Sequence, residues 1–406
     1  MTTATITHSS ARTRANPGGL KKRRGREKRR GPARSGAGAT SPAFVALGIV
    51  LAALISFGLV MVLSASSVAG LRDAGDPWIL FKKQLVGVFL GSIALVVCAR
   101  IDYRKWRHAA GPALLISLAL LTIVLVPGIG IKVSGSTRWL GFGPVRLQPS
   151  EFAKLALLVS LADLFTRRKD EMANSSRTLY PALISVGALI GLVALEPDMG
   201  TMLILAIITF AMLFAAGTPL LPIAKLSGYS LAGAVVFTLF EPYRRDRVLS
   251  FLHPFKDSGN TGYQVVQSLL GLGTGGIDGI GLGASRAKWG FLPNAHTDFI
   301  FAVIGEELGL IGAVGVLGLL AAFCILGARI ALRAPDRFGM LLAIGITAWI
   351  AAQAIINIGA VVGMLPVTGV PLPFVSFGGS ALVVLMSAAG VLLNVARNER
   401  ASARRS

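Results

Sequence analysis

The chain has 406 residues, of which 53% are hydrophobic and only 15% are charged, and its formal net charge is +21. A water-soluble protein of this length needs far more charge to cover its surface, so the composition excludes a soluble globular domain and indicates an integral membrane protein. The two cysteines, Cys98 and Cys324, stand in separate apolar runs, a spacing that argues against a disulfide framework or a cysteine metal site.

The first 42 residues are polar and basic, and they include the run KKRRGREKRR at 21–30. Such runs occur in nucleic-acid-binding arms, but they are also typical of tails held near anionic lipid headgroups or another protein. An apolar run long enough to cross a membrane follows directly. We therefore favour a disordered basic cytoplasmic tail at 1–42, whose Gly-, Ser- and Ala-rich continuation to Thr40 is a linker.

Ten apolar runs follow the tail, each close to the roughly 20 residues that cross a hydrocarbon core of about 30 Å. The fold class predicted is an all-α polytopic membrane protein with ten transmembrane helices in a domain at 43–396, followed by a basic cytoplasmic tail at 397–406. The fourth run is short, and its polar start indicates a helix that lines a cavity. The runs lie at 43–66, 79–99, 109–126, 150–165, 179–195, 199–217, 219–240, 299–328, 339–362 and 379–396.

Lysine and arginine set the predicted orientation, because loops that stay in the cytoplasm carry these residues in excess. With the N-terminus inside, the predicted cytoplasmic segments together carry a net charge of +21, which equals the charge of the whole chain. All other segments therefore net to zero, and both termini are predicted to lie in the cytoplasm. The segments are 1–42, 100–108, 166–178, 215–225, 326–338 and 397–406.

Three predicted external segments differ from ordinary connections. Residues 127–149 are rich in glycine, 241–298 form a large extracellular loop between helices 7 and 8, and 363–380 are rich in proline and glycine. Irregular backbone near a bilayer is tolerated only where protein or a water-filled cavity satisfies its polar groups. These segments therefore indicate a site at the outer face of the membrane.

Basic residues gather in the external segments, against the usual trend. Lys132, Arg138, Arg146 and Lys154 surround the third and fourth runs. Such residues could pair with an anionic ligand or extend to outer-leaflet phosphates. Because Lys154 lies inside an apolar helix, we favour the ligand for Arg138 and Lys154. Both explanations stay open for the arginines of EPYRRDR, at the start of the long loop: Arg244, Arg245 and Arg247.

Acidic side chains stand at the start of the eighth run, in NAHTDFIFAVIGEELG at 294–309. Asp298 is either a general base poised by partial burial and nearby cations, or an acid that satisfies the free amide groups of a helix start. Glu306 and Glu307 lie deeper, where a carboxyl must be protonated, paired or wet, and we expect structural hydrogen bonds for them. Asp198, in a tight hairpin, is a second candidate acid or a helix cap.

Four motifs occur together in this chain: QPSEFAK at 148–154, EPDMGT at 196–201, HTDFIFAVIGEELG at 296–309, and a segment at 357–380 that ends in MLPVTGVPLPFVSFGGS. Their combination resembles the SEDS family of cell-wall polymerases, named for shape, elongation, division and sporulation. The resemblance covers all ten runs. The stretch GLGASRAKWGFLPNAHTD at 281–298 is similar to the division branch, FtsW, more than to the elongation branch, RodA.

The resemblance implies a peptidoglycan glycosyltransferase. Its substrate would be lipid II, the undecaprenyl-pyrophosphate-linked disaccharide-pentapeptide, polymerised into β-1,4 glycan at the outer face of the bacterial cytoplasmic membrane during septal synthesis. The family's essential acid falls on Asp298. Residues assigned to substrate binding are Arg138, Arg146, Gln148, Glu151, Lys154, Asp198, His296, Thr297, Ser376 and Ser380.

The resemblance also implies partners. These are a class B penicillin-binding transpeptidase, other divisome proteins and membrane lipids, with no nucleic acid. No cofactor is certain, and a divalent cation, Mg²⁺ or Mn²⁺, is left open with unknown ligands. The alternatives are an elongation-type polymerase and, from another class, a transporter that flips lipid II. An inactive scaffold is a third alternative, and it would make Asp298 dispensable.

Overall fold

The computed structural model describes one unit of the chain, Ala39–Ser406, which holds every described helix and strand. The described residues are 2–3, 41–133, 136–142, 145–172, 175–239, 251, 254–255 and 262–403. Most of the predicted tail at 1–42 lies outside them, and so do Arg244, Arg245 and Arg247.

Helices make up most of the described chain, and each of the ten predicted apolar runs overlaps one of them. The helices are α1 Pro42–Ala74, α2 Ile79–Arg100, α3 Trp106–Leu125, α4 Pro149–Arg167, α5 Tyr180–Leu195, α6 Met199–Ala215, α7 Leu220–Leu239, α9 Tyr263–Gly275, α10 Ile300–Leu332, α11 Arg337–Val361 and α12 Gly379–Ala403. Short helical turns lie at Tyr103–Lys105, Lys169–Glu171, Ser175–Leu179 and Ala287–Trp289.

Seven helices among the described residues are long and apolar enough to cross a membrane. These are α1, α2, α3, α5, α10, α11 and α12, and α6 is apolar but shorter. Helix α4 carries Glu151, Lys154, Asp163 and Arg167, but nearly its whole length is buried by protein, so lipid contacts little of it. The number of crossings and the side on which the termini lie stay predictions.

A small sheet precedes α4, where the sequence analysis predicts only an irregular external segment. Strands β1 Gly130–Val133, β2 Ser136–Phe142 and β3 Val145–Leu147 pair antiparallel in that order. The pairing sets Ile131 opposite Trp139 and Gly141 opposite Arg146. The prediction of an all-α fold is therefore incomplete, because strand pairing satisfies the backbone polar groups of this segment.

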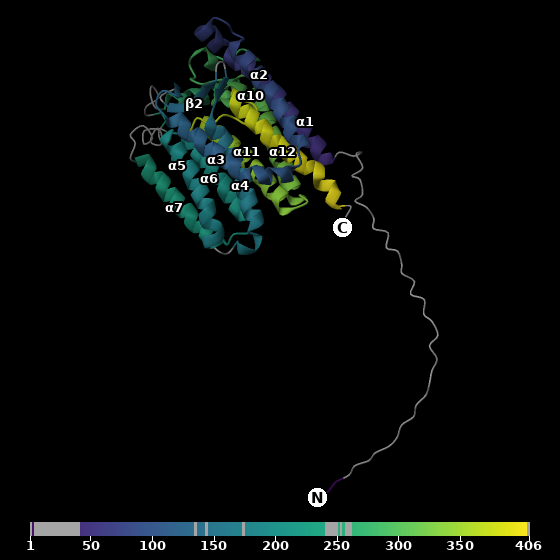
Figure 1. Ribbon diagram of the computed structural model, residues 1–406. Helices are drawn as coiled ribbons and strands as arrows, with labels where there is room; N and C mark the ends of the chain where they lie inside the picture. The colour runs from purple at the N-terminus through teal and green to yellow at the C-terminus, as the bar shows by residue number, and fades with distance from the viewer. Residues whose placement is uncertain are drawn as a thin grey trace, which may run out of the picture. The chain divides into compact units, whose positions relative to one another are not determined.

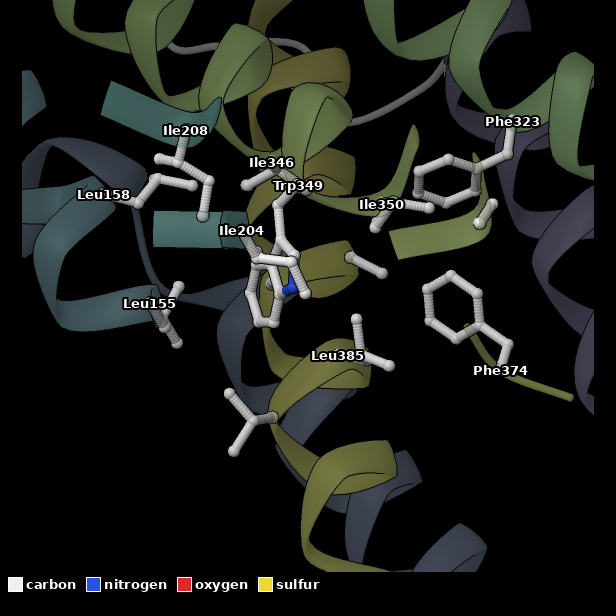
Figure 2. Packing of buried hydrophobic residues seen from close by; sticks show 14 of the residues in the cluster. Leu155, Leu158, Ile204, Ile208, Phe323, Ile346, Trp349, Ile350, Phe374 and Leu385 are labelled. Atoms are coloured by element: carbon white, nitrogen blue, oxygen red, sulfur yellow. The ribbon is translucent and has the colours of Figure 1, made fainter. Parts of the chain in front are cut away.

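Helices α12 and α2 lie side by side, with α11 and α10 next to α12 (Figure 1). A Cβ on Gly390 of α12 would overlap the backbone of Leu95 in α2, so this contact depends on a residue without a side chain. Figure 2 shows Trp349 of α11 at the centre of the core, among side chains of α4, α6 and α12. Its labelled neighbours include Leu155, Ile204 and Leu385.

Polar contacts join the helix ends on the side predicted to face the cytoplasm. Tyr103 donates its backbone N–H to Asn394 and its hydroxyl to Asp336 at 2.6 Å. Arg337 donates to the carbonyl oxygen of Ala216 at 2.6 Å. These residues belong to, or border, four predicted cytoplasmic segments, so the structure brings those segments to one end of the bundle.

Helix α10 is broken at Gly309, whose φ is 63° and ψ is −161°. The backbone N–H groups of Ile280 and Gly281 donate to the carbonyl oxygens of Glu306 and Glu307, both at 3.0 Å. On the other side of the break, Leu310 donates to the carbonyl oxygen of Gly276. Residues 276–281 therefore satisfy the backbone groups that the break exposes.

Candidate active site

Asp298 lies half-buried in the turn that leads into α10. It borders a small pocket at the end of the bundle opposite to the Tyr103 contacts. The other lining residues come from the start of α10, the end of α11 and the loop that follows α11. They are Phe299, Asn357, Ala360, Val367, Thr368, Gly369 and Val370.

Asn357 holds the backbone of this site together. Its side-chain nitrogen Nδ2 donates to the carbonyl oxygen of Asp298 at 2.6 Å and to that of Val370 at 2.7 Å. The side chain is 2% exposed, so water does not compete for these bonds. The turn that carries Asp298 and the loop after α11 are thereby fixed to the same residue of α11.

Ser376 provides a second link between the turn and the loop. Its hydroxyl donates to the carbonyl oxygen of Thr297 at 2.6 Å and accepts from the N–H of Leu372. The backbone N–H of Phe377 donates to the carbonyl oxygen of His296, and the two rings make an edge contact at 5.6 Å. Burial is the main cause that lowers the pKa of His296 below its ordinary value.

Gln84 extends this scaffold to α2. Its amide donates to the carbonyl oxygen of Ser376 at 3.2 Å and accepts from the N–H of Gly378 at 3.1 Å. The residue is buried, although Lys82 and Lys83 directly precede it in α2. The sequence analysis missed it, because an amide next to two lysines resembles a polar helix end.

Arg138 joins the small sheet to the hairpin between α5 and α6. Its Nε donates to the carbonyl oxygen of Glu196 at 3.0 Å, and its NH2 nitrogen donates to that of Pro197 at 2.6 Å. Another guanidinium nitrogen lies 3.9 Å from the carboxylate of Asp198. A quarter of the side chain stays exposed, so Arg138 is anchored in the protein and still reachable from solvent.

Asp198 caps α6, as one of the two predicted alternatives requires. Its carboxylate accepts from the backbone N–H of Thr201 at 3.0 Å and from the Thr201 hydroxyl at 2.9 Å. Gln148, directly before α4, donates to the same carboxylate at 3.4 Å. The capping role does not exclude a role toward substrate, which stays a prediction.

Glu196 is a buried acid that the sequence analysis did not assign. Its side chain is 1% exposed, and neither carboxyl oxygen has a hydrogen-bond partner among the described residues. Burial and the nearby charge of Asp198 raise its pKa to about 8, and Arg138 only partly opposes them. The position could have been suspected from EPD, which sets two acids between two apolar runs.

The start of α6 connects this hairpin to the Asp298 pocket. A Cβ at Gly200 would overlap Val370 and would lie 3.1 Å from the carbonyl oxygen of Thr368. Backbone of α6 therefore touches the loop that lines the pocket. Arg138 and Asp198 border the same end of the bundle as Asp298, as the sequence analysis expects.

Lys154 and Glu151 form a buried pair in the first two turns of α4. Their charged atoms are 2.7 Å apart and both side chains are almost fully enclosed. The Lys154 ammonium also lies over the ring of Trp349, 5.2 Å from its centre. Trp349 donates to Gln353, which in turn donates to the carbonyl oxygen of Pro371. The pair thus lies beneath the loop after α11.

The remaining predicted residues stand apart from these contacts. Arg146 is exposed in β3, and Lys132 is exposed in β1. Ser380 lies in the first turn of α12, and its hydroxyl has no hydrogen-bond partner in the part of the chain that is described.

The prediction of structural hydrogen bonds for Glu306 and Glu307 is confirmed. Glu306 accepts from the backbone N–H groups of Arg286 and Ala287. Glu307 pairs with Lys288 at 3.1 Å, both side chains being enclosed, and accepts from the hydroxyl of Ser64. These carboxylates fix the segment that precedes the Asp298 turn onto α10 and α1.

The described residues hold no cluster of three or more His, Cys, Asp or Glu side chains that could bind a metal ion. A divalent cation at this site therefore stays a prediction without assigned ligands.

Comparisons with known proteins show which family and which proteins this chain resembles. The family model FtsW/RodA/SpoVE, described as cell cycle protein, matches residues 45–401. A probable peptidoglycan glycosyltransferase FtsW of Trichlorobacter lovleyi is 42% identical over 86% of this chain and 91% of its own length. Stage V sporulation protein E of Bacillus subtilis is 41% identical, over 89% of this chain and 98% of its own.

A solved structure has the same architecture. It is described as showing how a peptidoglycan synthase complex coordinates polymerization and crosslinking. The similar chain in it is 31% identical, with a TM-score of 0.71, and the match covers 87% of this chain and 97% of that one.

Proposed function

This chain belongs to the FtsW/RodA/SpoVE family of cell cycle proteins, and from that premise we propose that it is a peptidoglycan glycosyltransferase that polymerises lipid II. The name of the Trichlorobacter lovleyi relative supports the activity. The observation that carries the proposal is the position of Asp298, whose carboxylate borders a pocket while its backbone is held by Asn357. This arrangement suits a general base that must keep its place while sugar chains move past it.

In the proposed reaction, the carboxylate of Asp298 accepts the proton of the 4-hydroxyl of an N-acetylglucosamine. The oxygen forms a bond to the anomeric carbon of the N-acetylmuramic acid of a second lipid-linked chain. The bond from that carbon to the pyrophosphate breaks, and the leaving group keeps the electron pair. Attack opposite to the leaving group inverts the α linkage to β-1,4. A pyrophosphate is weakly basic, so one acid suffices where glycosidases use two.

Cations are needed where the pyrophosphate leaves. Arg138 supports this role best, because its guanidinium is anchored to the hairpin and still partly exposed. Arg146 is exposed in the neighbouring strand and is a second candidate. Lys154 is enclosed with Glu151, so we assign that pair to shaping the site from below. Gln148 and Asp198 complete the Arg138 group.

The other predicted site residues are assigned by their contacts. Ser376 and Thr297 hold the Asp298 turn, and His296 supports it through Phe377. Ser380 offers a hydroxyl without a hydrogen-bond partner among the described residues, close in sequence to this loop. We assign them to positioning or to contacts with sugar.

We propose that the chain crosses the bacterial cytoplasmic membrane ten times, with both termini in the cytoplasm and Asp298 facing outward at the division septum. The predicted cytoplasmic segments carry a net charge of +21, equal to that of the whole chain, and this supports the orientation. The resemblance to a chain of a peptidoglycan synthase complex supports a crosslinking partner, which we expect to be a class B penicillin-binding transpeptidase.

The test uses purified full-length protein with lipid II in detergent, with and without the transpeptidase. We expect glycan strands from the wild-type chain and a loss of at least about 100-fold in Asp298→Asn, because a general base contributes about 10²- to 10⁴-fold. Asp278→Asn, which changes an exposed acid outside the pocket, is the matched control and should keep full activity. Wild-type rates from Asp298→Asn would refute the assignment. A chain that moves lipid II between the leaflets of vesicles but makes no glycan in detergent would be the transporter.

A further inference from the structure

The side-chain amide of Asn357 has one end satisfied and the other unpaired. Its Nδ2 gives its hydrogens to the carbonyl oxygens of Asp298 and Val370. Because carbonyl oxygens only accept, these two bonds decide which end of the amide is the nitrogen. The oxygen Oδ1 is therefore turned away from them, and it has no hydrogen-bond partner among the described residues although the side chain is buried.

A buried acceptor without a partner is unfavourable, so a ligand that donates a hydrogen to Oδ1 gains from it. Asn357 lines the pocket beside Asp298, and most of the other walls are apolar. The apolar lining residues are Phe299, Ala360, Val367 and Val370.

Gly369 keeps this space open next to the catalytic carboxylate. A Cβ at Gly369 would lie 3.6 Å from Oδ2 of Asp298, so any side chain there would enter the pocket. The φ of Gly369 is 74°, a conformation that other residues adopt only with strain. The pocket thus combines one buried acceptor and an apolar wall beside Asp298.

We infer that this pocket binds the acetamido group of a 2-acetamido sugar. The N–H of that group donates to Oδ1 of Asn357, and its methyl packs against the apolar wall. The inference rests on the proposed function, because both sugars of lipid II carry this group.

The consequence is selectivity for N-acetylated lipid II. A sugar with a free amine at this place keeps an N–H donor, but it brings a positive charge against the apolar wall and leaves that wall without the methyl. Burying a charged group beside apolar side chains is unfavourable, so the pocket prefers the neutral acetamido group.

The experiment compares polymerisation rates on modified lipid II. One substrate has the N-acetylglucosamine deacetylated and another has the N-acetylmuramic acid deacetylated, so the arms identify which sugar occupies the pocket. N-formyl versions of both keep a neutral amide N–H without the methyl and without the positive charge of an amine. We expect one arm to lower kcat/KM by about tenfold or more in the wild-type chain, from the positive charge of the amine and the loss of one buried methyl. N-formylation should restore part of this loss.

Two variants connect the effect to the pocket. In Asn357→Ala the rate falls on every substrate because the Asp298 turn loosens, but the preference for the acetylated sugar should drop below about threefold. Ala360→Val narrows the pocket from α11 without touching Asp298, and it should slow acetylated substrate while leaving the deacetylated one almost unchanged. Ala354→Val changes an equally buried alanine of the same helix that does not line the pocket, and it should keep the wild-type preference.

Thermal unfolding in detergent checks that each variant folds. If Asn357→Ala does not fold, the comparison of Ala360→Val with the wild-type chain is the test. The inference is wrong if wild-type protein uses both deacetylated substrates within about twofold of lipid II, or if both variants keep the wild-type preference. If wild-type protein does not polymerise lipid II at all, the proposed function fails and the inference fails with it.

Discussion

Glu196 lies close to the candidate site, and its surroundings disfavour the charged form of its carboxyl. Its carboxyl is enclosed, has no hydrogen-bond partner among the described groups and lies near Asp198. Burial and the neighbouring negative charge both disfavour its ionised form, and they raise its pKa to about 8 from 4.5. The hairpin that anchors Arg138 is therefore most stable when Glu196 is protonated.

The stability of the protein should therefore fall as pH rises through this pKa. Between about pH 4.5 and pH 8 the folded state binds a proton that the unfolded state releases, so the contribution is complete below pH 4.5 and is lost above pH 8. Each pKa unit corresponds to about 1.4 kcal/mol, which makes the effect a few kcal/mol at most. The melting temperature of Glu196→Gln should fall less than that of the wild-type chain between pH 6 and pH 9. Equal slopes for the two proteins would mean that Glu196 ionises normally.

At the scale of elements, the break in α10 determines how the active-site turn is held. Gly309 interrupts the helix, and residues 276–281 bond to the groups on both sides of it. Glu306 and Glu307 then bind the segment at 285–288, which leads on to the turn with Asp298. The position of Asp298 thus depends on a helix that stops and restarts.

Gly309→Ala should weaken this arrangement. Its φ of 63° and ψ of −161° are strained for any other residue, at a cost of about 1–3 kcal/mol, and the added Cβ would overlap the carbonyl oxygen of Ile277. We expect a lower melting temperature together with slower glycan synthesis. Gly315→Ala lies in the same helix with open space around it and should be neutral or slightly stabilising. Equal behaviour of the two variants would contradict a required break.

The sequence predicted the helices and not the contacts between them. Apolar runs gave the positions of α1 to α7 and of α10 to α12 well because lipid imposes a length and a composition on every crossing, whereas α9 lies inside the predicted loop at 241–298 and was missed. The position of Glu306 and Glu307, deep in an apolar run, was likewise enough to predict structural hydrogen bonds for them. The unpartnered oxygen of Asn357 and the burial of Glu196 depend on contacts with residues far away in the chain. Periodicity and motif spacing therefore could not predict them. The sheet was missed because its strands are short and lie in a glycine-rich segment.

At the scale of the whole molecule, the contacts divide the helix ends into two groups. Tyr103, Asp336 and Arg337 join one end, while Asp298, Asn357 and Ser376 join the other. Four of the segments predicted for the cytoplasm contribute to or border the first group, and the site residues belong to the second. The orientation of the entire bundle therefore decides whether the site can meet a substrate whose sugars project outside the cell.

Cysteine labelling in intact cells tests that orientation. The background is a chain with both native cysteines replaced by alanine. Lys132→Cys and Met364→Cys put a thiol at exposed positions of the site end, and Lys105→Cys and Lys169→Cys put one at exposed positions of the opposite end. A membrane-impermeant maleimide should label the first two in intact cells and the other two only after lysis, because a charged reagent does not cross the bilayer. The reverse pattern would turn Asp298 toward the cytoplasm, where no glycan strand is built, and the proposed function could not stand.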